Sequence, residues 1–438
     1  MTDGDDSSPT PTRRRFLAGT ATALAAGTAG CGYVPGGGDL AWEEPIRTGG
    51  LAFESGRWYR PTANRLVTIE NQSGQAYDFE EAVWREVSNA AVAVLTPDGI
   101  HRAVGETERQ VTAPPAVADD AAFLSVEDGR LTALDLSAGE TADSTAGGAT
   151  TSESDGDAVR WRVDVGARLG AGTDGGDQSS GPVFRGVRAS DALAVAIGGK
   201  GIAAFDAETG EKAFVVPDLW TDASSDGTLA DPTPRVAVDG ETAWVLVPAA
   251  AADSDGDAAI VGYDRAGDRR VERSVATVHR WLVAVDGTVV IGAPGASMAG
   301  FDGDFDRRFA LDAPASSARP TAGRPDDGRF YYSRSRTVTA VDVEAGEVAF
   351  EWSESPPDHL AVGAAGLYVA ENAGGFDDDT EARVVAIGDG GRVLWEAPLP
   401  DRVDPERLFA IGDRLVVVDD GTAYGFRATS GERWSPLG

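Results

Sequence analysis

The sequence predicts an all-β protein, an eight-bladed β-propeller of four-stranded antiparallel blades, with seven blades as the alternative. Three observations lead to this fold. A strand followed by Asp, a tight turn and Gly-Glu recurs along the chain, and most copies lie about forty residues apart. β-Branched and aromatic residues alternate with polar ones, and no segment keeps a helical period. Four short strands with their turns fill such a repeat, and units of this size build propeller blades.

Residues 1–31 are interpreted as an export signal. The residues that match a twin-arginine pattern are Arg13, Arg14, Phe16 and Leu17. The mildly apolar run at 18–29 is too short and too rich in Gly, Ala and Thr to span a bilayer as a helix. The run ends at Cys31 in a context similar to a lipobox, although Thr28 departs from the usual Leu. We therefore expect export, lipidation at Cys31 and anchoring to the outer face of the cell membrane.

Residues 32–57 are expected to form a tether that also supplies a strand to close the ring. The stretch 32–39 is glycine-rich and reads as a flexible linker. Leu40 to Trp58 precedes the first full repeat, so a strand within it can complete the last blade. Residues 58–438 are expected to form the propeller itself.

The turn motif has three clear copies and several degenerate ones. Its Asp can accept hydrogen bonds from turn amides, and its Gly tolerates a positive φ. The residues assigned to this structural role are Asp135, Gly139, Asp206, Gly210, Asp342, Gly346 and Gly431. Degenerate copies at 96, 264, 302, 388 and 427 bring the number of repeats to eight.

A large aromatic residue ends most repeats and is expected to fill the space between neighbouring sheets. The residues predicted for this position are Trp161, Phe214, Trp352, Trp395 and Trp434. Longer steps between repeats contain polar insertions at 141–157, 170–181, 249–257 and 372–381.

The charge balance indicates the solvent in which the protein works. The chain has 438 residues and a formal net charge of −33, and its only lysines are Lys200 and Lys212. Such an acidic surface excludes nucleic acid as a partner. It suits molar salt, where screening acts over about 3 Å. We interpret the composition as that of a halophilic protein.

The repeats over residues 58–438 resemble the PQQ-like (quinoprotein-type) β-propeller repeat, in which an apolar-Ala-Leu-Asp run is followed by Gly-Glu and Trp. Exported, lipid-anchored members include the BamB-type scaffold lipoproteins of outer-membrane assembly. A twin-arginine signal with this acidity points to an archaeal halophile without such a membrane, so that particular role is not carried over.

The resemblance also implies an enzymatic alternative, because family enzymes oxidise alcohols or sugars with pyrroloquinoline quinone and Ca²⁺. The adjacent-cysteine disulfide of the larger alcohol-oxidising members cannot form, since Cys31 is the only cysteine. The three histidines, His101, His279 and His359, lie in ordinary strand or loop contexts and are expected to be structural. Acidic runs at 153–157 and 253–257 resemble the start of calcium loops but lack the closing Glu. No cofactor or metal is therefore expected.

The sequence favours a non-catalytic, surface-tethered propeller that binds an unidentified protein partner as a scaffold or assembly factor. The alternative is a PQQ- and Ca²⁺-dependent oxidoreductase, or a propeller that binds a small ligand in its central channel. Because one propeller fold carries many functions, the fold does not decide between these alternatives.

Overall fold

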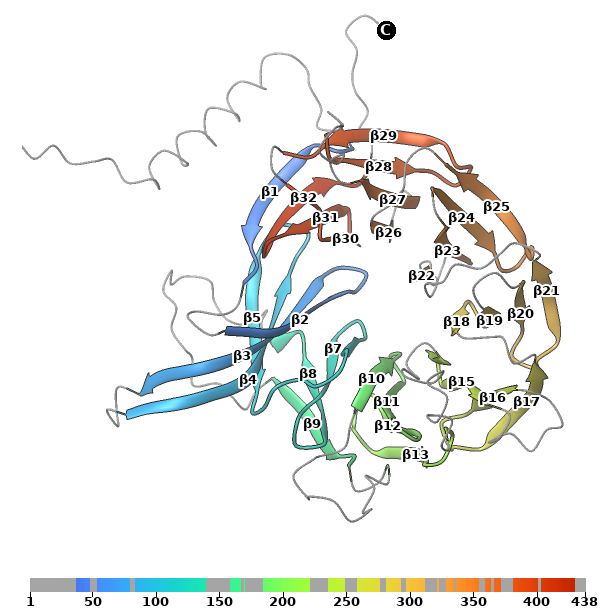
Figure 1. Ribbon diagram of the computed structural model, residues 1–438, viewed down its shortest axis with the longest axis horizontal. Helices are drawn as coiled ribbons and strands as arrows, with labels where there is room; N and C mark the ends of the chain where they lie inside the picture. The colour runs from blue at the N-terminus through green and yellow to red at the C-terminus, as the bar shows by residue number, and fades with distance from the viewer. Residues whose placement is uncertain are drawn as a thin grey trace, which may run out of the picture.

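The described residues of this computed structural model form eight four-stranded antiparallel sheets arranged as a ring (Figure 1). The described residues are 37–47, 53–78, 83–138, 158–166, 169, 184–220, 235–248, 258–275, 281–292, 297–311, 321–322, 328–334, 336–353, 359–363, 366–371, 381–400 and 403–429. The all-β, eight-bladed prediction is confirmed, and the seven-blade alternative is wrong.

Each blade runs from an innermost first strand to an outermost fourth strand. Blade 1 contains β2 (Phe53–Pro61), β3 (Leu66–Asp78), β4 (Val83–Leu95) and β5 (His101–Thr107). Blade 2 contains β6 (Ala116–Val117), β7 (Ala121–Ser125), β8 (Arg130–Asp135) and β9 (Val159–Asp164). Blade 3 contains β10 (Phe184–Ala189), β11 (Leu193–Gly198), β12 (Ile202–Asp206) and β13 (Lys212–Val216). Blade 4 contains β14 (Val236–Asp239), β15 (Thr242–Pro248), β16 (Ala258–Tyr263) and β17 (Arg269–Val275).

The second half of the ring repeats this order. Blade 5 contains β18 (Trp281–Val285), β19 (Thr288–Gly292), β20 (Met298–Phe301) and β21 (Arg307–Leu311). Blade 6 contains β22 (Thr321–Ala322), β23 (Arg329–Arg334), β24 (Thr337–Asp342) and β25 (Glu347–Trp352). Blade 7 contains β26 (His359–Gly363), β27 (Gly366–Glu371), β28 (Arg383–Ile387) and β29 (Val393–Pro398). Blade 8 contains β30 (Arg407–Ile411), β31 (Arg414–Asp419), β32 (Thr422–Arg427) and β1 (Leu40–Pro45).

The ring closes through β1, which comes from the start of the chain but is the outermost strand of blade 8. It pairs antiparallel with β32, so that Trp42 lies opposite Gly425 and Pro45 opposite Thr422. The next strand, β2, already begins blade 1 at Phe53, so it straddles the boundary expected at residue 58. The sheet of blade 8 therefore joins the two ends of the propeller.

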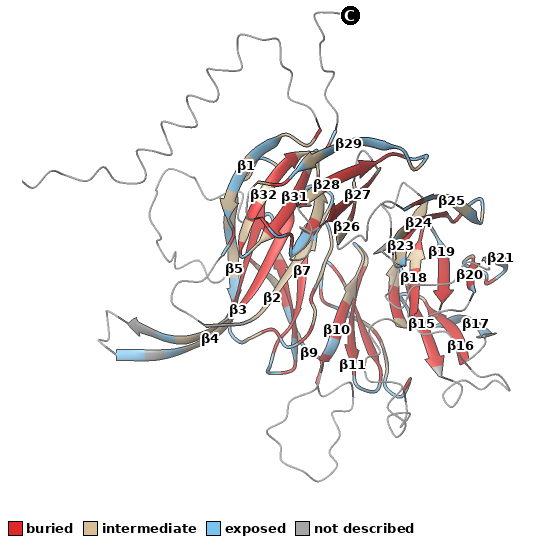
Figure 2. Ribbon diagram, turned by 45° about the horizontal axis from the view of Figure 1, so that its top comes forward, coloured by how far each residue is buried: buried red, intermediate tan, exposed pale blue. Residues whose placement is uncertain are grey.

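Apolar cores lie between neighbouring blades (Figure 2). The described residues form eight such clusters, and the one that joins blades 8 and 1 contains Ile46, Leu66 and Ile411, each at most 1% exposed. Middle strands such as β11 are buried along their whole length, whereas outermost strands such as β29 show exposed positions. Among these described residues, no helix has the length and apolar character needed to cross a membrane.

An aromatic side chain on the fourth strand of one blade packs on the turn glycine of the next blade. Trp161 of blade 2 covers Gly210 of blade 3 so closely that a Cβ there would lie 2.6 Å from the indole. The Trp161 Nε1–H also donates to the Ala207 carbonyl at 3.1 Å. The other aromatic and glycine pairs among the described residues are Phe214 with Gly267, Phe309 with Gly346, Phe350 with Gly391, Trp395 with Gly38 and Trp42 with Gly99.

In blades 6 and 8, the aromatic residue that packs on the turn glycine is not one of the predicted aromatic residues. In blade 6 the glycine contact is made by Phe350, whereas Trp352, two residues further along and 4% exposed, packs in the core between blades 6 and 7. The register shift of this blade also occurs in blades 2, 3 and 7, so Phe350 is the equivalent of Trp161, Phe214 and Trp395. In blade 8 the position belongs to Trp42, whose Nε1–H donates to the Pro97 carbonyl at 2.7 Å. Trp434 lies outside the described residues.

The contact between Trp161 and Gly210 is expected to stabilise the ring beyond the turn itself. Gly210→Ala places a methyl group at positive φ (70°) and against the indole. Gly240→Ala is the matched control, because Gly240 also has a positive φ (52°) but nothing within 4 Å of the new methyl. Both variants should lose the roughly 1–2 kcal/mol of left-handed backbone strain, and Gly210→Ala should lose about 1–3 kcal/mol more through overpacking. Urea unfolding at high salt measures both losses, and equal values would contradict the inter-blade contact.

Candidate functional site

Turns lie on both faces of the ring. The turn face carries the turns that join first to second and third to fourth strands, such as residues 206–211. The opposite face carries the turns between second and third strands, such as residues 420–421, and the connections between blades. The described aspartates in or beside turns of the turn face include Asp119, Asp120, Asp135, Asp191, Asp206, Asp239, Asp264, Asp286, Asp302, Asp342, Asp389 and Asp413.

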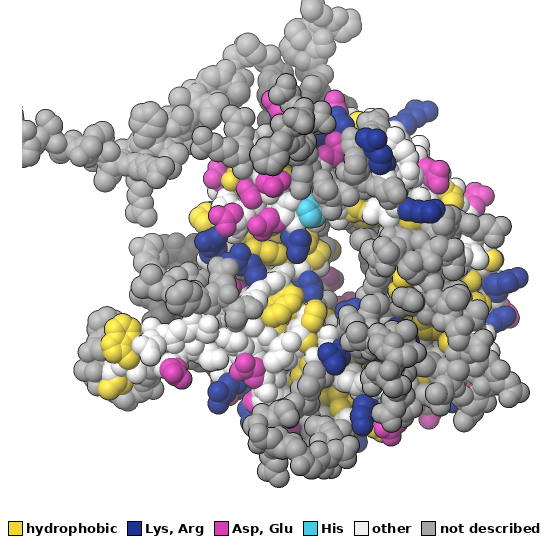
Figure 3. Space-filling view, in the orientation of Figure 1, with side chains coloured by type: hydrophobic (Ala, Val, Ile, Leu, Met, Phe, Trp, Pro, Cys, Tyr) yellow, Lys and Arg dark blue, Asp and Glu magenta, His cyan; other side chains and the backbone are white. Residues whose placement is uncertain are grey.

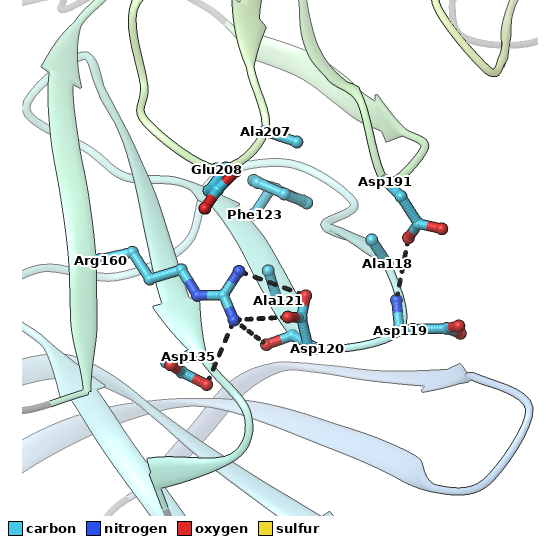
Figure 4. Close-up of a pocket in the computed structure, with 10 residues that line it drawn as sticks. All are labelled: Ala118, Asp119, Asp120, Ala121, Phe123, Asp135, Arg160, Asp191, Ala207 and Glu208. Carbon is cyan, nitrogen blue, oxygen red and sulfur yellow. Dashed lines mark hydrogen bonds and ion pairs between the residues drawn. The ribbon is translucent and has the colours of Figure 1, made fainter.

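A pocket of about 510 Å³ opens on the turn face between blades 2 and 3 (Figure 4). Arg160 lies across it, with its Nη2 2.9 Å from Asp120 Oδ2 and 3.3 Å from Asp135 Oδ1. Asp119, Asp191 and Glu208 also line the pocket. Five carboxylates around one guanidinium favour a cationic group in the remaining space.

The pocket lacks the features of an acid–base active site. Burial would raise the pKa of Asp135, but hydrogen bonds from Ser137 and Arg160 outweigh burial and lower this pKa below its ordinary value. A carboxylate of this kind stays ionised at neutral pH, whereas a general acid or base needs a pKa near the working pH. The arginine and the turn hydrogen bonds therefore give Asp135 a structural role.

The histidine that the structure describes in blade 1 belongs to a buried polar cluster. His101 Nε2 lies 3.4 Å from Thr68 Oγ1. Nearby, Arg57 donates to the Glu70 carboxylate at 2.9 Å, and the Glu70 side chain is only 2% exposed. Burial lowers the pKa of His101, so its imidazole is neutral at neutral pH. His359 lies half-buried at the start of β26, and His279 lies outside the described residues.

The innermost strands bring arginines to the central channel. Two lie in β2, two in β10, and one begins β30; these residues are Arg57, Arg60, Arg185, Arg188 and Arg407. The eight described first strands contain only two acidic residues, Glu54 and Asp239. The whole chain has 71 acidic and 38 basic residues, so the balance at the axis is reversed. Figure 3 shows dark blue Lys or Arg side chains and one cyan histidine beside the central opening.

A long hairpin projects from blade 1 beyond the ring (Figure 1). Its strands β3 and β4 each have 13 residues, whereas the middle strands of the other blades have four to seven. β2 pairs with β3 only as far as Ser73, and β5 pairs with β4 only from Ala90. Among the described residues, the outer part of the hairpin, residues 74–78 and 83–89, which we call the arm, therefore pairs only within itself. Trp84 near its end is 66% exposed.

The structure describes only part of the residues singled out in the sequence. The export residues Arg13, Arg14, Phe16 and Leu17, the lipidation residue Cys31, the turn residues Gly139 and Gly431, and the acidic runs at 153–157 and 253–257 lie outside the described residues. Asp206 and Asp342 each accept turn amide hydrogen bonds, and Gly210 and Gly346 have φ values of 70° and 67°. The arm and the channel arginines were not predicted from the sequence, because neither belongs to the repeated turn motif.

No protein-family model and no curated protein matches the chain. Among solved structures, the C-terminal WD40 domain of Sif2 is similar with a TM-score of 0.51 and 9% identity, over 91% of this chain and 98% of that one. BamB from Moraxella catarrhalis matches with a TM-score of 0.48 and 15% identity, over 89% and 97% of the two chains. Quinohemoprotein alcohol dehydrogenase from Comamonas testosteroni matches with a TM-score of 0.47 and 14% identity, over 91% and 78%. At these identities, the likeness concerns the propeller fold alone.

The described residues do not fit the quinone cofactor with Ca²⁺ that the PQQ-like resemblance implies. Ca²⁺ requires six to eight converging oxygen ligands, among them carboxylates. In the parts of the chain that the structure describes, no three His, Cys, Asp or Glu side chains converge closely enough to hold a metal ion. We therefore derive no oxidation step for this chain.

The turn aspartates should make the ring sensitive to acid. Burial alone would raise the pKa of Asp206, but hydrogen bonds from Thr209 and the charge of Arg265 hold the pKa of Asp206 below its ordinary value. Its stabilising effect is therefore complete above the unfolded pKa of about 3.9 and is lost as the pH falls through the lower folded pKa. Asp206→Asn keeps the turn acceptor and removes the charge, so its stability should fall less steeply between about pH 5 and 2.

Thermal unfolding at constant salt across this pH range measures the slope. Glu208→Gln in the same turn is the control, because no hydrogen bond or ion pair of its carboxylate occurs among the described residues. A slope that Asp206→Asn leaves unchanged would contradict the ionic role of Asp206.

Proposed function

We propose that the protein is a non-catalytic scaffold, exported and lipid-anchored at Cys31 in a halophilic cell, that binds a partner protein through the arm of blade 1. The observation that carries this proposal is the exposed Trp84 on a hairpin that extends past its own sheet. A propeller blade needs neither the extra strand length nor the exposed indole, because its cores lie between the blades.

The arm offers two kinds of contact. Within the part of the chain that the structure describes, which omits 48–52, residues 74–78 of β3 and 83–89 of β4 have no neighbouring strand along their outer edges. Such edges can pair with a strand of another protein. Trp84 and Val83, at 66% and 43% exposure, add an apolar anchor of the kind that dominates binding energy in protein interfaces.

The charge of the arm defines the partner surface. The sequence of the arm, residues 74–78 and 83–89, contains two acidic residues and one Arg, and the connecting residues 79–82 add two more acidic residues. This charge disfavours insertion into an anionic bilayer. It fits a partner with an apolar pocket for the indole and a basic rim around it.

The position of β1 is consistent with a membrane anchor on the opposite side of the ring. Leu40 lies opposite Phe426, so the chain enters β1 at the turn face. The nine residue steps from Cys31 to Leu40 span at most about 30 Å. A lipid on Cys31 would then hold the turn face toward the membrane and leave the arm free to meet a partner.

Chemical crosslinking of intact cells at native salt, followed by purification and mass spectrometry, tests the scaffold proposal. We expect one dominant protein partner, whose capture falls at least about tenfold in Trp84→Ala, as for an interface hot spot. Leu394→Ala is the matched control, because Leu394 is 46% exposed on β29, far from the arm in sequence and on another blade. No enriched partner, or equal loss in both variants, would contradict the proposal.

Cys31→Ser tests the anchor separately. A lipidated protein should move from the membrane fraction to the medium when its acceptor sulfur is lost. Cell fractionation and immunoblotting measure this shift, with Cys31→Ser and the native chain expressed at equal levels. A variant that stays in the membrane fraction would show that Cys31 is not the anchor.

A further inference from the structure

The exposed large apolar side chains of the described residues lie at two places. Val83 and Trp84 belong to the arm. The others lie at the turn-face ends of blades 7, 8 and 1, which follow one another in the ring; they are Leu40 (47% exposed), Ile100 (44%), Val393 (41%) and Leu394 (46%). Figure 1 places the outermost strands of these blades, β29, β1 and β5, next to one another. Leu394 packs on Gly388 of its own turn, and we call Leu40, Ile100 and Val393 the apolar patch.

The repeat shows what other blades carry at two positions of this patch. Leu40 and Val393 each stand two residues before the aromatic residue of the fourth strand, with one bulged residue between. In blades 3, 4 and 5 this position is basic, and the residues are Lys212, Arg269 and Arg307. In blades 6, 1 and 2 it is apolar, and the residues are Val348, Ala103 and Val159. One side of the ring is therefore basic at this position and the other side apolar.

Ile100 departs from the other blades in the same way. The Thr96 N–H donates to the Ile100 carbonyl across the turn at 3.1 Å. Other described turns make this hydrogen bond to a charged residue, and those residues are Glu211, Asp268, Asp306 and Arg392. Because blades accept charge at both positions, the packing of the fold does not explain the change to apolar residues. Exposed apolar residues gathered in one sector instead indicate a contact surface.

The chain enters the ring in this same sector. The Gly38 N–H donates to the Arg427 carbonyl of blade 8 at 2.9 Å, and a Cβ on Gly38 would lie 2.6 Å from Ala397 of blade 7. The chain therefore passes over the junction of blades 7 and 8 before it forms β1. The seven residue steps from Cys31 to Gly38 span at most about 25 Å. A lipid on Cys31 would hold this sector of the turn face within that distance of the bilayer.

We propose that the apolar patch docks on the surface of the lipid bilayer and is the second membrane contact beside the lipid on Cys31. This inference rests on the proposed lipid anchor. A single lipid chain gives only marginal membrane binding, so stable anchoring takes a second contact. Leu40, Ile100 and Val393 supply it, because each can move apolar area from water into the interface.

The charges around the patch keep the docking shallow. Asp39 directly precedes Leu40, and Asp98 lies two residues before Ile100. These carboxylates stay in water if only the projecting apolar side chains enter the headgroup region. The net charge of −33 repels an anionic bilayer, but in molar salt this repulsion is screened over about 3 Å. The apolar contact does not depend on charge and persists in such salt.

Vesicle binding at molar salt tests the patch. The full chain with Cys31→Ser is mixed with vesicles of phosphatidylcholine and phosphatidylglycerol in equal parts, and the bound fraction is measured by flotation. Adding Leu40→Gln, Ile100→Gln and Val393→Gln together should lower the partition coefficient at least about tenfold, since apolar transfer is lost. Lys212→Gln with Arg307→Gln, on the basic side of the ring, is the matched control and should bind as before.

A labelling experiment locates the contact. Cys31 is the only cysteine, so Cys31→Ser leaves a chain in which a single cysteine can be introduced and labelled. An environment-sensitive dye on Ile100→Cys should shift its emission to the blue when vesicles are added. The same dye on Arg307→Cys, or on Trp84→Cys in the arm, should not shift.

The combined glutamine variant should also keep the thermal unfolding midpoint of the native chain, because other blades carry charged residues at the equivalent positions. A lower midpoint would assign the patch to packing. Absent vesicle binding, equal binding of the combined variant, or a dye shift at residue 84 or 307 would overturn the proposal. Partner capture that falls in the combined variant while vesicle binding stays would assign the patch to a protein.

The vesicle experiment uses a chain without the acceptor sulfur, whereas the anchor is tested by fractionation of cells and the arm by crosslinking at Trp84. Failure of the apolar patch is therefore distinguishable from failure of the anchor or of the scaffold.

Discussion

The ring depends on the contact between a fourth-strand aromatic side chain and the turn glycine of the next blade. A blade alone cannot bury both faces of its sheet, so its stability comes from its two neighbours. The packing of Trp161 on Gly210 ties the outer edges of two blades together at the rim, while the apolar clusters join their faces. Trp42 extends the series across the junction of the chain ends, where only β1 can supply the aromatic.

The contact between blades 4 and 5 shows how the ring tolerates the loss of this aromatic. Val271 occupies the fourth-strand position in β17, opposite Gly262. The turn of blade 5 replaces the usual glycine with Phe305, which has a φ of 61° and is 3% exposed. Its ring packs edge-on against Trp244 at 5.2 Å between centroids. The aromatic group thus comes from the opposite blade, and the left-handed strain at Phe305 is offset by its burial.

The sequence predicted the fold because the repeat signals are local. An Asp that caps a turn and a Gly at positive φ, as in Asp206 and Gly210, must lie within a few residues of each other. The ring-closing strand was also predictable, since residues 40–58 precede the first repeat. Trp352 packs in the core between blades 6 and 7, but the glycine contact belongs to Phe350, which follows Asp342 by the same spacing as Phe214 follows Asp206. The arm was missed because strand length beyond a blade leaves no change in the alternation of residues.

The roles of the site residues were harder to predict, because each role depends on contacts with residues far away in the sequence. Arg57, Arg60 and Arg407 look alike in the sequence, but among the described residues Arg57 pairs with a buried carboxylate, whereas Arg60 and Arg407 donate to backbone carbonyls. If the channel arginines served only to offset the net charge of −33, carboxylates would be the partners that an acidic chain supplies most readily. Arg60 instead bonds to carbonyls, which position the guanidinium and leave its charge in place. The position of the Arg60 guanidinium therefore depends on the Pro115 carbonyl, which lies 55 residues away in the sequence and in the next blade, and no local pattern reveals such a contact.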